Sequence, residues 1–151
     1  MVFGEVLFDH FPDGGKVLGG APFNVAWHLQ ALGTDPLLVS GVGGDAEGDE
    51  ILDRMREWGL STEGVQTTPG RETGRVEVRM NEGEPSYHIV SDQPWDHLDP
   101  MQAEDSLADP SEFGLLYHGS LALRNPGGRE TLAALIEKSG APGFPDVNLR
   151  P

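Results

Sequence analysis

Apolar runs alternate with amphipathic segments along the first part of the chain. The expected strands are residues 2–8 and 36–42, the expected helices are 24–32 and 45–58, and a turn at 9–15 follows the first strand. The first helix is expected to bury Val25, Leu29 and Leu32 on one face. Gly33 is its expected C-terminal stop, and Asp45 is a candidate N-cap for the second helix. Strands and helices in this alternation predict a parallel β-sheet covered by helices.

The hydrophobic period changes in the middle of the chain. Apolar and charged residues alternate from Arg75 to Met80, and the alternation resumes at Tyr87 and Ile89 after a turn at 81–85. This pattern predicts a β-hairpin with one face toward solvent. The other expected elements are a loop with at most a short helix at 92–110, a strand at 115–117, a helix at 129–139 and a final strand at 145–149.

The charge and composition of the chain exclude some classes of partner. Its 151 residues carry a formal net charge of −15, whereas nucleic acid and anionic membrane surfaces are bound by clustered Lys and Arg. There is no cysteine for a disulfide or a metal site, and the five histidines lack metal-ligand spacing. The sequence also has no long apolar run typical of a membrane span and no pattern typical of a secretion signal. We therefore expect a cytoplasmic protein without a metal site of its own.

Two features suit the binding of a small polar ligand. Asp9 ends the first apolar run, and open α/β sheets bind ligands at the carboxyl ends of their strands. Gly19 and Gly20 allow a ligand close to the backbone, and the Asn24 amide can both donate and accept hydrogen bonds. From spacing alone, a cap or turn role for Asp9 and a structural turn at the glycines are the simpler interpretations. The run is not a Walker A loop, because no Gly-Lys-Ser/Thr follows it.

The run Gly19-Gly20-Ala21-Pro22-Phe23-Asn24-Val25-Ala26, followed by Gly33 and Gly43, resembles the N-terminal signature of the ribokinase-like, or PfkB, carbohydrate kinases. Other segments are similar to later parts of these kinases, in the same order: residues 4–9, 43–60, 73–76, 116–123 and 146–150. The first and last of these segments are most similar to the fructokinase-like branch.

The resemblance implies an α/β fold with a Rossmann-type parallel sheet flanked by helices and a small β lid, formed by residues 10–18 and 65–92. It implies ATP-dependent phosphorylation of a sugar hydroxyl, with Mg²⁺ as the cation. The implied sugar-binding residues are Asp9, Gly19, Gly20 and Asn24. Asn148 and Arg150 are implied near the phosphate and Mg²⁺, although a solvated strand end would have the same sequence pattern.

Members of this family are longer, and their C-terminal half carries a Gly-Ala-Gly-Asp-type turn with the catalytic base. These 151 residues contain no such turn. We therefore expect residues 1–151 to be the N-terminal, sugar-binding part of the kinase domain, without the nucleotide-binding half and inactive alone. The expected partners are a sugar, the C-terminal half, and a second copy through the lid or an open sheet edge. Two alternatives are a non-catalytic carbohydrate-binding or interaction fragment, and a nucleoside kinase of the same family.

Overall fold

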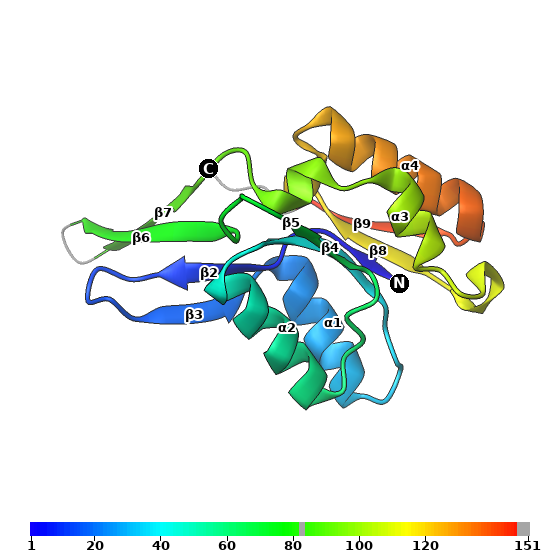
Figure 1. Cartoon of the computed structure of the whole chain (residues 1–151), viewed down its shortest axis with the longest axis horizontal. Coiled ribbons are helices and arrows are strands. Elements are labelled where there is room, and N and C mark those ends of the chain that lie inside the picture. The colour runs from blue at the N-terminus through cyan, green and yellow to red at the C-terminus, as the bar shows by residue number, and fades with distance from the viewer. Residues whose placement is uncertain (82–83, 148–151) are drawn as a thin grey trace.

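The computed structural model describes residues 1–81 and 84–147. Over these residues the chain forms a five-stranded parallel sheet, with helices on both faces, and a four-stranded sheet beside it (Figure 1). The main sheet has the strand order β5-β4-β1-β8-β9, with β1 at Val2–Phe3, β4 at Leu38–Gly43, β5 at Val65–Thr68, β8 at Leu116–Gly119 and β9 at Gly143–Asp146. All neighbouring strands in it are parallel, so the predicted α/β sheet is confirmed.

Helices cover both faces of the main sheet (Figure 1). One face carries α1 (Ala21–Ala31) and α2 (Ala46–Trp58), and the other carries α3 (Pro100–Asp105) and α4 (Pro126–Ser139). Burial on both faces of the sheet explains why the two residues of β1 are apolar. Val2 packs in the core cluster that includes α1 and α2, Phe3 packs in the cluster that includes α3 and α4, and both are fully buried. A parallel strand covered on both faces is apolar throughout instead of alternating.

The single strand predicted at 2–8 is wrong, because this segment contributes to both sheets. After β1 the chain leaves the main sheet at Gly4 and enters the second sheet as β2 (Leu7–His10). Gly4 has a φ of 149°, and a Cβ at this position would lie 2.4 Å from Cγ of Pro22. Only glycine therefore allows the chain to turn here with α1 packed against it. Leu7 and Phe8 are as buried as the β1 residues, so the apolar run hides the change of sheet.

The second sheet has the strand order β3-β2-β6-β7, with β3 at Lys16–Gly19, β6 at Arg75–Asn81 and β7 at Glu84–Ile89. The β6–β7 hairpin is the one that the alternating pattern predicts. The turn expected at 9–15 is shorter, because Asp9 and His10 belong to β2. Both residues pair with β3, a strand that the sequence did not predict. Residues 65–68, also not predicted as a strand, form β5 of the main sheet. The second sheet therefore uses only the later part of the 65–92 segment.

Helix α1 begins three residues earlier than predicted. Pro22 lies in its first turn, where proline needs no partner for a missing N–H. The helix buries Pro22, Phe23 and Ala26. Val25 and Leu29 of the predicted face are half-buried against the core, whereas Leu32 is 77% exposed, so the predicted face is wrong only at Leu32. The predicted end is confirmed, since Gly33 follows the helix with a φ of 73°.

The acidic segment at 92–110 contains the short helix that the sequence allows, but it is more buried than its composition suggests. It contains a 3₁₀ turn at Pro94–His97, followed by α3. Trp95 is fully buried against Gly74, and Asp96 accepts hydrogen bonds from the Arg124 guanidinium at 2.8 and 3.3 Å. The strand expected at 145–149 begins at Gly143 instead. Residues 148–149 of that prediction lie outside the described residues.

Asp45 is confirmed as the N-cap of α2, and its carboxylate also fixes a second segment. It accepts hydrogen bonds from the Gly48 N–H at 2.8 Å, the Thr73 N–H at 2.7 Å and the Thr73 hydroxyl at 2.5 Å. Burial alone would raise the pKa of Asp45, but the hydrogen bonds from Thr73 and Gly48 outweigh it and lower the pKa below its usual value. Asp45 therefore links the start of α2 to the segment that leads into β6.

We expect Asp45→Ala to destabilise the fold by about 1–3 kcal/mol at pH 7, because it removes a helix cap and two further hydrogen bonds. Since the folded-state pKa lies below the unfolded value of about 3.9, the contribution is complete above about pH 5. It is lost as the pH falls through the folded-state pKa. Urea unfolding of the original chain and of Asp45→Ala between pH 3 and 7 measures this difference in stability. A difference in stability that stays constant over this range would contradict the account.

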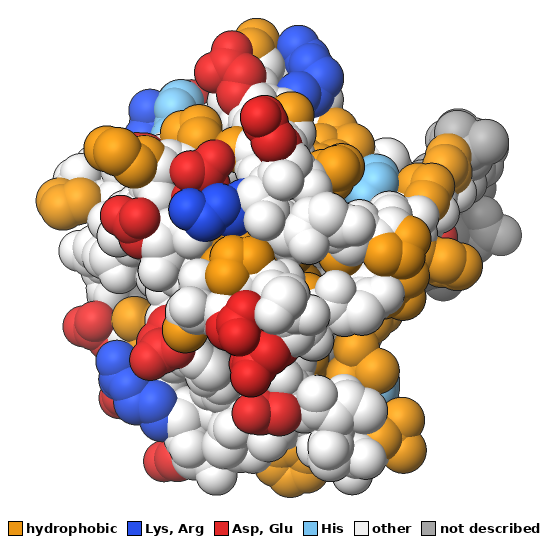
Figure 2. Space-filling view, turned by 90° about the vertical axis from the view of Figure 1, so that its right-hand side faces the viewer, with side chains coloured by type: hydrophobic (Ala, Val, Ile, Leu, Met, Phe, Trp, Pro, Cys, Tyr) orange, Lys and Arg blue, Asp and Glu red, His pale blue; other side chains and the backbone are white. Residues whose placement is uncertain are grey.

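The surface of the described chain is acidic and mixed. On the face drawn in Figure 2, acidic side chains are scattered among hydrophobic ones and basic side chains are sparse, as the net charge of −15 implies. Among the described residues, no helix combines the length and the apolar content that crossing a bilayer would require.

Candidate functional site

A cavity of about 500 Å³ lies between the main sheet and the second sheet. Its polar lining consists of Glu5, Asp9, Asn24, Tyr87, Ser120 and Asp146. Its apolar lining consists of Leu7, Ala21, Val76, Ile89 and Leu121. The residues that follow β1 and those that end β8 and β9 all reach it, so the cavity lies at the carboxyl end of the parallel sheet. Open α/β sheets bind ligands at this end.

Gly20 brings the N-terminus of α1 against the floor of this cavity. It has a φ of 110°, and a Cβ here would lie 2.5 Å from the carbonyl oxygen of Glu5. Gly20 also caps α1 without a side-chain hydrogen bond. The start of the helix therefore faces the cavity through backbone and not through a capping side chain, which is favourable for a polar or anionic ligand atom.

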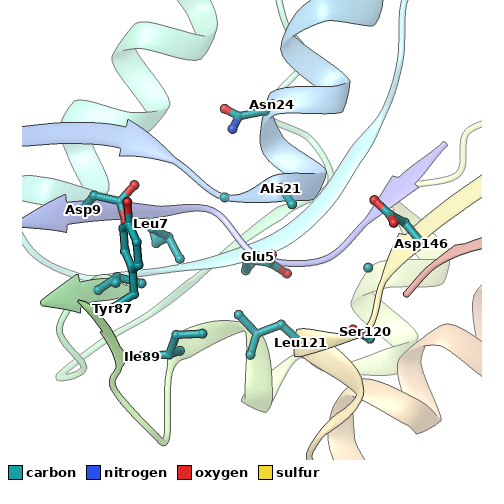
Figure 3. A pocket seen from close by; sticks show the side chains of 13 residues that line it. Glu5, Leu7, Asp9, Ala21, Asn24, Tyr87, Ile89, Ser120, Leu121 and Asp146 are labelled. Atoms are coloured by element: carbon teal, nitrogen blue, oxygen red, sulfur yellow. The ribbon is translucent and has the colours of Figure 1, made fainter. Parts of the chain in front are cut away.

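Figure 3 shows how the polar side chains lie around the cavity. Asp9 and Tyr87 lie together at one end, Asp146 and Ser120 lie at the other, and Glu5 lies between them. Asn24 projects from α1 above this row. Glu5 is almost completely buried, whereas Asp9 is half-buried and Asn24 is exposed. Carboxylate and amide groups in such a row can accept and donate hydrogen bonds to several hydroxyls of one ligand.

A tyrosine behind the cavity holds Asp146 in place. The Tyr117 hydroxyl donates a hydrogen bond of 2.6 Å to Oδ2 of Asp146. Burial raises the pKa of Tyr117, and the negative charges of Asp146 and Glu5 raise it further. The phenol therefore stays protonated and remains a donor to Asp146 at physiological pH. This bond joins the end of β9 to β8.

The structure brings together three of the four residues expected to bind the ligand. Asp9, Gly20 and Asn24 line the cavity, whereas Gly19 lies beside it. A Cβ at Gly19 would lie 3.2 Å from Oδ2 of Asp9, so the small residue leaves space for this carboxylate. Asn148 and Arg150 lie outside the described residues.

Four polar lining residues were not among the expected ligand-binding ones. Glu5 has a recognisable signal, because it is an acidic residue inside an apolar run and directly after a glycine. Tyr87, Ser120 and Asp146 reach the cavity from distant segments, and their sequence positions alone do not indicate a shared site.

A second hollow, of about 660 Å³, lies at the N-terminus of α4. Its charged side chains are engaged with one another or with nearby groups. Arg124 pairs with Asp96, and Asp92 pairs with His97 and Arg71. The cavity between the sheets is the better candidate site, because it lies at the carboxyl end of the parallel sheet, where open α/β sheets bind ligands.

A model of the pfkB family of carbohydrate kinases matches residues 5–150. The chain belongs to this family. It is 31% identical over 148 residues to an uncharacterized sugar kinase of Pyrococcus horikoshii, covering 95% of this chain and 44% of that protein. It is 30% identical over 143 residues to fructokinase-like 1, a chloroplastic protein of Arabidopsis thaliana, covering 91% of this chain and 30% of that protein. The chain thus spans less than half the length of these curated relatives.

Solved structures share the fold of this pfkB-family chain. The Pyrococcus horikoshii sugar kinase superposes with a TM-score of 0.84 at 28% identity, covering 98% of this chain and 54% of that one. A fructokinase from Xylella fastidiosa with bound ATP gives a TM-score of 0.86 at 25% identity, covering 99% of this chain and 48% of that one. The main sheet and its helices therefore have the ribokinase-like arrangement.

Proposed function

We propose that these 151 residues form the sugar-binding part of an ATP-dependent sugar kinase of the fructokinase-like type. The observation that carries the proposal is the convergence of Asp9, Asn24 and Glu5 on one cavity at the carboxyl end of the parallel sheet. The family match and the similarity to a fructokinase-like protein support a sugar as the ligand.

In this proposal the carboxylate of Asp9 accepts hydrogen bonds from two adjacent sugar hydroxyls, and Asn24 bonds a third. Charge-assisted hydrogen bonds of this kind fix which face of the sugar is presented. Leu7, Val76 and Ile89 would contact the apolar face of the ring. These residues orient the acceptor hydroxyl, and orientation is a large part of catalysis in phosphoryl transfer.

The phosphoryl donor in the proposal is ATP with Mg²⁺. In the described part of the chain, no group of three His, Asp or Glu side chains is arranged to hold a metal ion, so the Mg²⁺ is expected to enter bound to the nucleotide. The catalytic base is expected on a Gly-Ala-Gly-Asp-type turn of further polypeptide. Strand β9 offers that polypeptide an edge, because it is the last strand of the main sheet among the described residues. Phe144 in this strand and Val147 after it are exposed apolar side chains that the polypeptide could cover.

Calorimetric titration of the chain with D-fructose, D-ribose and adenosine, joined to an ATP phosphorylation assay, tests this proposal. We expect saturable binding of a sugar and no phosphorylation by material of verified mass. Preferential binding of adenosine would indicate a nucleoside kinase instead. Phosphorylation by the chain alone would mean that the catalytic base lies within these residues, and no sugar binding would overturn the proposal.

A further inference from the structure

A chain of ion pairs connects the β2–β3 hairpin to helix α2. Nζ of Lys16 lies 3.1 Å from Oε1 of Glu47 and 2.6 Å from Oε2 of Glu50. The other oxygen of Glu50 accepts a hydrogen bond from Arg54 at 2.6 Å, and Oε2 of Glu47 lies 3.3 Å from Nε2 of His10. Two residues of the hairpin and three of the helix therefore form one network.

The network lies on the face of the hairpin opposite the cavity. Lys16 pairs with His10 across the two strands, so their side chains share a face. Phe8 shares this face too, and Nζ of Lys16 lies 4.2 Å from the centre of its ring. Asp9 stands between Phe8 and His10 in the same strand, so its side chain points the other way, into the cavity. Fixing one face of the hairpin thus fixes the carboxylate on the other.

The network contacts the part of the hairpin that lies beyond its packing in the apolar core. Phe8 is fully buried in the core cluster that includes Ile51 and Met55 of α2, and it anchors the base of the hairpin. Beyond the His10–Lys16 pair the chain turns through exposed residues 11–15. Lys16 is the only lysine or arginine between residues 7 and 19. Strand β2 is paired with β6 as far as His10, whereas β3 is the edge strand of the described sheet. The ion pairs of Lys16 therefore hold the outer part of β3, and with it the hairpin, against α2.

Lys16 is the central member of this network. The side chains of Lys16, Glu47 and Glu50 are 30%, 26% and 31% exposed. The hydrogen bond between Lys16 and Glu50 raises the pKa of the lysine and lowers that of the glutamate. Single exposed ion pairs contribute little, but a shared network with a fixed geometry contributes more. Glu50 is itself fixed by Arg54, four residues further along α2.

We propose that Lys16 is a positioning residue that holds the β2–β3 hairpin against α2 and thereby keeps the Asp9 carboxylate in the sugar-binding cavity. The role in sugar binding rests on the function proposed above, whereas the clamping of the hairpin does not. Because the clamp is electrostatic, it weakens in concentrated salt.

The test compares Lys16→Met with Lys16→Arg in the 151-residue chain. Lys16→Met keeps the unbranched apolar part of the side chain without the charge, and Lys16→Arg keeps the charge. Arg56→Met is the matched control, because it removes an exposed pair with Asp53 that lies entirely within α2. Two quantities are measured for each protein: the amide hydrogen exchange of residues 7–19, and the affinity for D-fructose by calorimetry.

We expect Lys16→Met to speed hairpin exchange by about three- to tenfold and to weaken fructose binding by a similar factor. Lys16→Arg and Arg56→Met should stay close to the original chain in both measurements. In 0.5 M NaCl the original chain should approach the exchange rates of Lys16→Met.

Unchanged hairpin exchange in Lys16→Met would overturn the proposal. Faster exchange with unchanged fructose affinity would overturn the positioning role. If the original chain binds no sugar at all, the proposed function fails, but the exchange comparison still decides whether Lys16 clamps the hairpin.

Discussion

Replacing Asp9 by asparagine is expected to weaken sugar binding by about ten- to a hundredfold. The amide keeps the shape of the side chain but loses the charge, and a hydrogen bond to a charged group contributes about 1.5–3 kcal/mol. Asp9 lines the cavity, and its surroundings should change little because the amide is the same size as the carboxylate. Calorimetric titration with D-fructose measures the effect.

Asp13→Asn is the control for this experiment. Asp13 lies in the exposed turn of the same hairpin, where its carboxylate accepts a hydrogen bond from the Gly15 N–H at 2.9 Å. We expect this variant to bind fructose like the original chain. An equal loss in both variants would show that Asp9 acts through the stability or charge of the hairpin and not as a sugar ligand.

Gly20→Ala is expected to destabilise the fold by about 2–4 kcal/mol and to abolish sugar binding. The new Cβ would lie 2.5 Å from the carbonyl oxygen of Glu5, at a φ of 110° that alanine rarely adopts. Relief of this contact requires α1 to move away from the segment that carries Glu5, and both line the cavity. Urea unfolding and fructose titration measure the two effects.

Gly14→Ala is the control that distinguishes the backbone strain of a positive φ from the steric contact that a Cβ at Gly20 would make. Gly14 also has a positive φ, of 85°, but a Cβ there would meet nothing within 4 Å. We expect this variant to lose about 1–2 kcal/mol, which is the cost of the backbone conformation alone. If both variants lose the same stability, the close approach of Gly20 to Glu5 is not a determinant of the fold.

The elements that the sequence predicts well are those marked by residues within the same segment, such as a capping side chain, a terminal glycine or an alternating pattern. Helix α2 is predicted within a residue, because Asp45 caps it and Gly59 follows it with a φ of 77°. The β6 strand of the β6–β7 hairpin is predicted because Val76 and Val78 are buried and the charged residues that alternate with them are not, which produces an alternation. Asp9, Gly20 and the family signature identify one side of the cavity, since these residues lie close together in the sequence.

The rest of the fold depends on contacts between distant segments. An apolar run such as residues 2–8 does not show that it divides between two sheets, because both halves are buried. Trp95 lies in an acidic segment that has the composition of a loop, and its burial depends on the absence of a side chain at Gly74. Tyr87, Ser120 and Asp146 become neighbours of Asp9 and Glu5 only through the pairing of strands. No pattern within a single segment of the sequence indicates that such distant residues lie together.

The most direct test of the central claim is a titration of the ¹⁵N-labelled chain with D-fructose, followed by NMR. If the cavity between the two sheets binds the sugar, the largest shifts at saturation occur at the amides of Gly20, Asn24, Tyr87 and Ser120. The Asp9→Asn variant should need a higher sugar concentration to reach them. Shifts confined to the second hollow, at residues such as His97 and Asn125, or no shifts at all, would contradict the claim.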